Sequence, residues 1–130
     1  RVFYGEALEN RNALTTAATA RALEAVMTDA VLSPPACKRL RDLLARSLAS
    51  EQRQADPENQ VDGFLGAGLP QGSRLWSKAG WMSQARHDAA WWRTLDDSPT
   101  LLVVFSEGAA CAKDETLLPE LARQLAAFQC

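Results

Sequence analysis

Apolar residues recur at helical spacing in two stretches of the first half of the chain. After Thr15, or the threonine that follows it, such residues return every three or four positions up to about Val31. The step Ser33-Pro34-Pro35 then reads as an N-cap followed by proline in a first helical turn. The leucines behind it predict a second helix that extends to about Arg53. The first dozen residues show no sustained period and are expected to form a loop.

The second half changes to strand-like patterns after a loop at residues 55–72, which holds two prolines and four glycines. Phe64 and Leu65 are expected to attach this loop to the core. Strand candidates follow at residues 74–78, 84–94 and 100–106. The third is an unbroken apolar run, which predicts a buried strand. The turn sequence Asp96-Asp97-Ser98-Pro99 makes the last two an antiparallel hairpin.

The chain ends in a third predicted helix. Asp114 is its expected cap, Pro119 lies near its first turn, and leucines with Phe128 form its apolar face. Strands and helices are therefore segregated along the chain. This order predicts an α+β fold in which helices flank an antiparallel sheet, formed by one domain over residues 1–130.

Composition excludes several classes of protein. A chain of 130 residues can bury a core, and its net charge of −2 gives no reason to expect nucleic acid as a partner. No apolar run approaches the ~20 residues of a membrane span. One histidine and three scattered cysteines form no zinc spacing, and no phosphate-binding glycine loop is present. We therefore expect no metal, no cofactor and no membrane span.

Three cysteines leave at least one thiol unpaired within the chain. Cys37 falls in step with the leucines of the second helix and is expected to pack in the core. Cys111 and Cys130 flank the terminal helix of about 16 residues, so they should lie roughly 24 Å apart and form no disulfide.

Candidate chemistry centres on Lys78-Ala79-Gly80 at the end of the first predicted strand. A lysine there can present an ammonium to a cleft, and the glycine lets a ligand approach the backbone closely. Such a site suits an anionic or carbonyl-bearing substrate that lies along the strand edge. A solvated lysine before a turn explains the tripeptide equally well. Trp76 and Trp81 bracket it, and one of them is a candidate to line the substrate.

The order of the pieces around this tripeptide resembles the C-terminal part of the class A-like serine β-lactamase and penicillin-binding protein superfamily. The resemblance implies a β-lactamase-like αβα sandwich, of which the chain is a partial domain. It also implies acyl transfer from a β-lactam, a D-alanyl peptide or a related amide or ester, and a periplasmic or extracellular location. The matching pieces are Asn12-Ala13-Leu14-Thr15-Thr16-Ala17, Val31-Leu32-Ser33-Pro34, Gly68-Leu69-Pro70, Trp76-Ser77-Lys78-Ala79-Gly80 and Arg86-His87-Asp88.

Two motifs of that superfamily are missing from this chain. Its enzymes use a serine nucleophile in Ser-x-x-Lys and a second motif Ser-x-Asn. No lysine here has serine three residues before it, and no asparagine has serine or tyrosine two residues before it. In a full-length relative both would lie upstream of Arg1, so the N-terminal part of the same enzyme is the expected partner, with a dimer as another outcome. Glu6 to Asn10 is similar to the deacylation motif, although its distance to Thr15 is too short.

The resemblance also assigns roles within the strand pair. Lys78, Ala79 and Gly80 would bind the substrate, and the backbone N–H of Trp81 would be one donor of the oxyanion hole. Arg86 would bind the substrate carboxylate.

Two neighbouring residues, His87 and Asp88, have other expectations. His87 should face the side opposite Arg86, and which of the two faces the cleft is left open. A catalytic His87 competes with a packed or solvated one, and Asp88 is expected to form a structural ion pair or hydrogen bond.

Two alternatives to an enzyme remain. Alanine at position 79 lacks the hydroxyl that would help to hold a carboxylate. The chain could therefore be a catalytically silent binding or scaffold domain of the same fold. An unrelated α+β interaction module is the other alternative.

Overall fold

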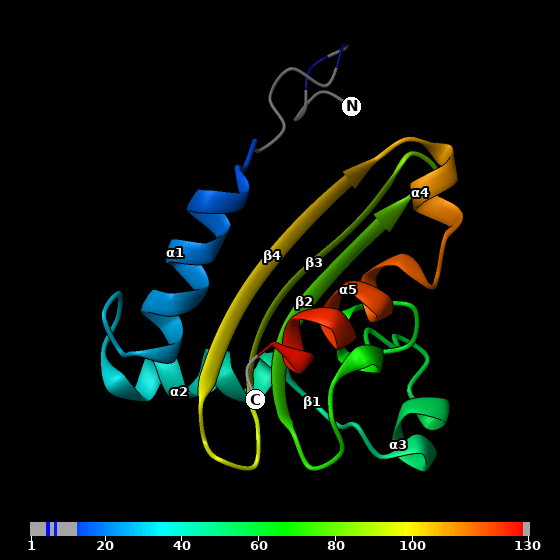
Figure 1. Cartoon of the computed structure of the whole chain (residues 1–130). Coiled ribbons are helices and arrows are strands. Elements are labelled where there is room, and N and C mark those ends of the chain that lie inside the picture. The colour runs from blue at the N-terminus through cyan, green and yellow to red at the C-terminus, as the bar shows by residue number, and fades with distance from the viewer. Residues whose placement is uncertain (1–4, 6, 8–12, 129–130) are drawn as a thin grey trace.

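The computed structural model describes Gly5, Ala7 and residues 13–128 (Figure 1). The predicted N-terminal loop, the Glu6 motif and Cys130 lie outside these residues, apart from Gly5 and Ala7. In chain order the elements are α1 (Thr16–Met27), α2 (Pro34–Leu44), β1 (Ala45–Arg46), α3 (Ser50–Ala55), the 3-10 helix η1 (Leu65–Gly68), β2 (Arg74–Met82), β3 (Ala85–Arg93), β4 (Pro99–Glu107), α4 (Ala109–Lys113) and α5 (Leu117–Ala127).

The described strands form one antiparallel sheet in the order β1-β2-β3-β4. Its register sets Ala79 opposite Asp88, and Asp88 opposite Val104. Helices α1 and α2 cover one face, while α5 and η1 cover the other (Figure 1). This αβα arrangement confirms the predicted α+β fold with an antiparallel sheet between helices.

Strand alternation divides the core into two layers. Trp92 belongs to the larger layer, beneath α5, together with Leu118 and Ala122 of that helix. Trp91 belongs to the smaller layer, against Leu23 of α1. The two adjacent tryptophans thus serve opposite faces, as the alternation of side chains in a strand requires.

The α5 side of the larger layer depends on a close backbone approach. A Cβ atom placed on Gly68 of η1 would lie 1.9 Å from the carbonyl oxygen of Pro119 and 3.1 Å from Cβ of Ala122. Only glycine leaves room for this approach, since side chains in a packed core have no space into which to withdraw. Gly68 therefore fixes how closely α5 approaches η1.

The helix ends differ from the predictions. Helix α1 ends at Met27 rather than near Val31, because Asp29 adopts a left-handed φ of 57°. Helix α2 ends at Leu44 rather than near Arg53, because Ala45 is extended (φ −61°, ψ 132°) and pairs with Trp76. The short helix α4 was not predicted. Cys37 is fully buried, as expected.

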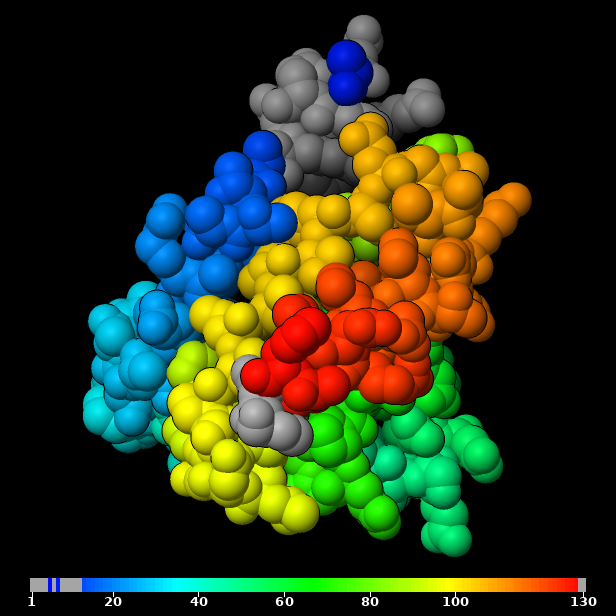
Figure 2. Space-filling model, viewed as in Figure 1, coloured from blue at the N-terminus to red at the C-terminus, as the bar shows by residue number. Residues whose placement is uncertain are grey.

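Two strand predictions also need correction. Strand β2 runs on to Met82 instead of ending at Lys78, because its partner β3 continues beside it. Strand β4 is only half-buried, and Phe105 is 37% exposed. Among the described residues β4 pairs with β3 alone, and its surface lies open between α1 and α5 (Figure 2). An apolar run can therefore mark an edge strand.

The start of α5 is close to the prediction. Thr116 occupies the N-cap position, but Oδ1 of Asp114 accepts hydrogen bonds from the N–H groups of Thr116 (2.8 Å) and Leu117 (3.2 Å). Pro119 lies in the first turn, where its missing N–H costs the helix nothing.

Candidate functional site

Four of the predicted site residues, Lys78 to Trp81, lie on the second half of β2, along the part of its edge that β1 leaves uncovered; Arg86 lies on β3. Strand β1 covers β2 only at Leu75 and Trp76, so among the described residues no strand pairs with β2 on that side beyond this point. The N–H of Ala79 points out of the sheet edge, since it donates to Oε1 of Gln60 at 3.0 Å. Backbone direction repeats every second residue, so the N–H of Trp81 faces the same open edge.

Lys78 lies beside this edge with an exposed side chain. It belongs to the sheet face that carries Trp76, opposite Ala89. Its ammonium turns back toward the strand, where Nζ donates to the carbonyl oxygen of Ala79 and lies 3.3 Å from Oε1 of Gln60. The structure thus places an ammonium beside the strand edge, within β2 rather than at its end; its role toward a substrate stays a prediction.

Ala79 and Gly80 differ in their surroundings. The Ala79 methyl group is 2% exposed and packs in the larger core layer with Val61, Phe64 and Leu65. A Cβ placed on Gly80 would meet no described atom within 4 Å. Position 79 therefore directs its side chain into the core, while Gly80 leaves the strand surface clear.

Arg86 is 7% exposed and is held by the protein itself. Its Nε donates to the Ala112 carbonyl oxygen at 3.0 Å and its Nη1 to that of Gly63 at 3.2 Å. Its Nη2 lies 3.7 Å from a carboxylate oxygen of Glu115. These contacts connect β3 to the loop before η1, at Gly63, and to α4, at Ala112. Substrate binding by Arg86 stays a prediction, and it would require some of these contacts to open.

An aromatic stack joins Arg86 to the strand edge. The guanidinium carbon lies 4.8 Å from the Phe64 ring centroid, and that ring lies 5.4 Å from the Trp81 ring. The Trp81 side chain is 48% exposed at the outer end of the stack. Arg86 thus supports the position of Trp81 through Phe64.

Asp88 is the most perturbed titratable group of the described residues. It is 1% exposed; Oδ2 accepts a hydrogen bond from the Leu65 N–H at 3.0 Å, which confirms a structural hydrogen bond. Burial raises the pKa of Asp88 to about 6, against the lowering effect of the Leu65 hydrogen bond and of the Arg46 and Lys78 charges. The carboxyl group therefore changes charge just below neutral pH.

His87 faces the opposite side of the sheet from Arg86, as predicted. Its ring packs against Phe105 at a centroid distance of 4.6 Å, and its Nδ1 accepts a hydrogen bond from the Ser106 N–H at 3.2 Å. These contacts make His87 a packed residue on the helix α1 side of the sheet.

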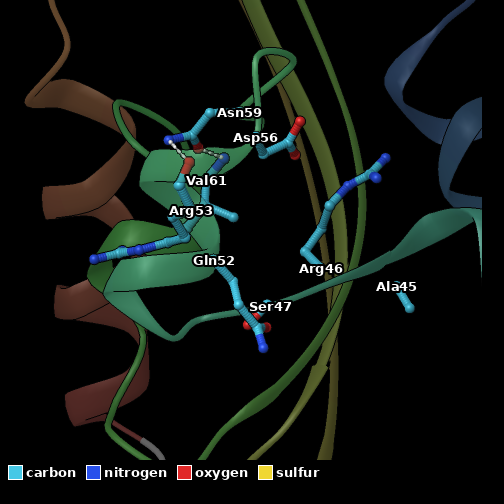
Figure 3. Close-up of a pocket in the computed structure, with 8 residues that line it drawn as sticks. All are labelled: Ala45, Arg46, Ser47, Gln52, Arg53, Asp56, Asn59 and Val61. Atoms are coloured by element: carbon cyan, nitrogen blue, oxygen red, sulfur yellow. Dashed lines mark hydrogen bonds between the residues drawn. The ribbon is translucent and has the colours of Figure 1, made fainter.

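Two site residues escaped the sequence analysis, Arg46 and Gln60. Arg46 ends β1, and its Nη2 donates to the Ser77 carbonyl oxygen at 2.9 Å. It also lines a hollow of about 70 Å³ between β1 and α3, where Arg46 and Arg53 extend to opposite sides (Figure 3). No local motif points to either residue, because both reach β2 from positions far away in sequence.

Metal-binding clusters and membrane-spanning helices are absent from the part of the chain that the structure describes. No three histidine, cysteine or acidic side chains there are grouped to hold a metal ion. No helix among those residues combines the length and apolar character needed to cross a bilayer.

The sheet has helices on both faces, and its Lys-x-Gly step lies on the part of β2 that β1 leaves uncovered; together these features define a β-lactamase-like αβα fold. The chain belongs to the β-lactamase enzyme family, whose family model matches residues 3–129. No curated protein matches the sequence.

Solved structures agree with this assignment. A class A β-lactamase described as the last common ancestor of Gram-negative bacteria is 27% identical, with a TM-score of 0.70 over 93% of this chain and 43% of its own. A β-lactamase from Xanthomonas campestris is 25% identical, with a TM-score of 0.70 over 96% of this chain and 46% of its own. The structure of PBP-A, 18% identical with a TM-score of 0.72, shares the fold over 93% and 42%. The chain thus spans less than half the length of these proteins.

Proposed function

We propose that this chain is the C-terminal part of a β-lactamase-like serine hydrolase. The observation that supports this most strongly is the open edge of β2, where an ammonium and two outward backbone N–H groups lie within four residues. Such an edge suits a small-molecule or peptide substrate with a carboxylate and a reactive carbonyl. In this proposal the N-terminal part of the same enzyme supplies the nucleophile, and the enzyme acts in the periplasm or outside the cell.

The proposed chemistry is acyl transfer. A serine oxygen attacks the carbonyl carbon of a β-lactam, D-alanyl peptide, or related amide or ester; the bond to the leaving group breaks, and water later releases the acyl group. Lys78 would hold the substrate carboxylate, and the Trp81 N–H would stabilise the developing oxyanion. Ala79 and Gly80 would form the wall between them.

The role of the Trp81 N–H is testable by replacing the residue with proline in the full-length gene product. Because this N–H faces the open edge, proline removes the donor without breaking the β2–β3 ladder. We expect Trp81→Pro to slow acylation by a fluorescent penicillin about 10²- to 10³-fold, the usual effect of losing one oxyanion donor. Trp81→Phe keeps both the N–H and the Phe64 contact, so it should label almost normally. Equal labelling of the two variants would contradict the proposed donor.

A catalytically silent domain of the same fold is the second candidate. Its supporting observation is Ala79, which lacks a hydroxyl and packs in the core. Failure of the full-length product to become labelled, with an intact upstream Ser-x-x-Lys, would favour this candidate over the enzyme.

The open edge of β4 is the proposed docking surface for the N-terminal part or, in its absence, for a second copy. Because the Ala79 N–H points away from β3, the backbone N–H and C=O of its partner Asp88 point toward β4. The backbone groups of Val104, which lies opposite Asp88, therefore point back toward β3. Their direction alternates along the strand, so the N–H groups of Leu101, Val103 and Phe105 point outward. An uncovered strand edge of this kind pairs readily with another strand.

We expect the 130-residue chain alone to dimerise, and Val103→Pro to shift it to the monomer. Proline removes an outward donor while sparing the β3–β4 ladder, whereas the matched control Val103→Ala keeps that donor. Light scattering after size exclusion measures the mass. A monomeric parent chain, or an undiminished dimer of Val103→Pro, would rule out pairing through this edge.

A further inference from the structure

Three side chains of the chain itself occupy the part of the β2 edge that a substrate would need. Arg46 donates to the Ser77 carbonyl oxygen, and Lys78 to that of Ala79. Gln60 takes the remaining position, with its Oε1 accepting the Ala79 N–H at 3.0 Å. The edge is therefore hydrogen-bonded, but by side chains rather than by a strand.

The environment of Oε1 of Gln60 suits a stronger acceptor than an amide. Nζ of Lys78 lies 3.3 Å from this oxygen and Nη2 of Arg46 lies 3.4 Å from it. Two cations and a backbone N–H thus converge on one neutral oxygen. A carboxylate at the same place would form charge-assisted hydrogen bonds, which are about twice as strong as neutral ones.

The backbone around Gln60 is held by its neighbour Asn59, so a rotation of the Gln60 side chain alone is enough to release the edge. Oδ1 of Asn59 accepts the N–H groups of Val61 and Asp62 at 3.0 Å, and its Nδ2 donates to the Arg53 carbonyl oxygen. Val61 is 3% exposed. Rotation of the Gln60 side chain would therefore free the Ala79 N–H without moving the loop.

We propose that Gln60 is an internal competitor that occupies the β2 edge until a carboxylate-ended amide ligand displaces it. The carbonyl oxygen of its side chain stands in for the ligand's carboxylate, between Arg46, Lys78 and the Ala79 N–H. This inference rests on the proposed function, since it concerns the same edge. It adds Arg46 and Gln60 to the residues that decide which ligands bind and how tightly.

The test compares the parent chain with Gln60→Ala and Gln60→Glu. The probes are N-acetylglycine, which ends in a carboxylate, and N-acetylglycinamide, which is the same molecule with a neutral end. Binding is followed by the backbone amide NMR signals of Ala79 and Trp81. If Gln60 occupies the edge in most molecules, the apparent affinity for the probe is reduced to the fraction of molecules in which the edge is free. We therefore expect Gln60→Ala to bind N-acetylglycine about 10-fold more tightly than the parent. The neutral probe should gain less.

Gln60→Glu gives the opposite expectation and guards against misfolding of the alanine variant. Its carboxylate would ion-pair with Arg46 and Lys78, so it should abolish binding of N-acetylglycine and melt at a higher temperature than Gln60→Ala. Equal affinities of the parent and Gln60→Ala, or tight binding by Gln60→Glu, would overturn the role of Gln60 while leaving the proposed enzyme intact. Absence of binding to every variant would overturn both this inference and the proposed β2-edge site.

Discussion

Replacing Gly68 with alanine is expected to destabilise the fold by about 3 kcal/mol, at the upper end for overpacking a core. The added Cβ would lie 1.9 Å from the Pro119 carbonyl oxygen and 2.8 Å from its carbonyl carbon. Both are backbone atoms in the first turn of α5, so they cannot withdraw unless the helix shifts away from η1. The free energy of unfolding in urea measures the loss.

Gly80→Ala is the matched control for this substitution. No described atom lies within 4 Å of a Cβ at Gly80, and its φ is not in the left-handed region. We expect this change to alter stability by less than about 0.5 kcal/mol. A Gly68→Ala variant within 1 kcal/mol of Gly80→Ala would show that α5 can shift freely, contrary to the close packing described above.

The difference in stability between the parent and Asp88→Asn is expected to change by about 2 kcal/mol between pH 4 and pH 8. Burial raises the pKa of Asp88 to about 6 from its ordinary 3.8, so folding disfavours the charged form. The stability that Asp88 contributes is complete below pH 3.8 and is lost as the pH rises through 6. Asparagine cannot ionise, while its amide oxygen can still accept the Leu65 N–H.

The measurement is urea unfolding of the parent and Asp88→Asn across this pH range. The difference between them should move in favour of asparagine as the pH rises from about 4 to 6, and level off above pH 6. Hydrogen bonds from Thr94 and Thr116 lower the pKa of Asp96 and of Asp114, respectively. The contribution of these two carboxylates to the stability of the fold is therefore lost as the pH falls. They are the same in both proteins and cancel in the comparison. A pH-independent difference would contradict the raised pKa of Asp88.

Local patterns predicted most of the helices and strands, because each helix turns an apolar side toward one face of the sheet and each strand has side chains that alternate between the two faces. They failed at α2, where leucines continue to Leu48 in helical step although the backbone turns extended at Ala45. The cause is pairing with Trp76, some thirty residues later in sequence, which a local pattern does not contain. The apolar run of β4 misled for a similar reason, since burial depends on how many strands lie beside it.

The strand that carries the candidate site was predictable from the sequence, but the side chains that contact it were not. The Lys-x-Gly step placed Lys78 and the Trp81 N–H at a strand edge. Arg46 and Gln60 reach that edge only through the fold, so no spacing in the sequence points to them. Arg86 is the opposite case. Its residue type predicts binding of a substrate carboxylate, whereas in the structure its guanidinium donates hydrogen bonds to the carbonyl oxygens of Gly63 and Ala112.

The unequal edges of the sheet limit how far the chain can assemble. Beyond β1, Arg46, Gln60 and Lys78 occupy the backbone groups of β2, which hinders the addition of another strand there. Among the described residues β4 alone offers a long, unpaired edge. If two copies join antiparallel through β4, as proposed, each contributes the same patch, and no second long unpaired edge is left among the described residues. The assembly would then close with twofold symmetry instead of growing into a fibre.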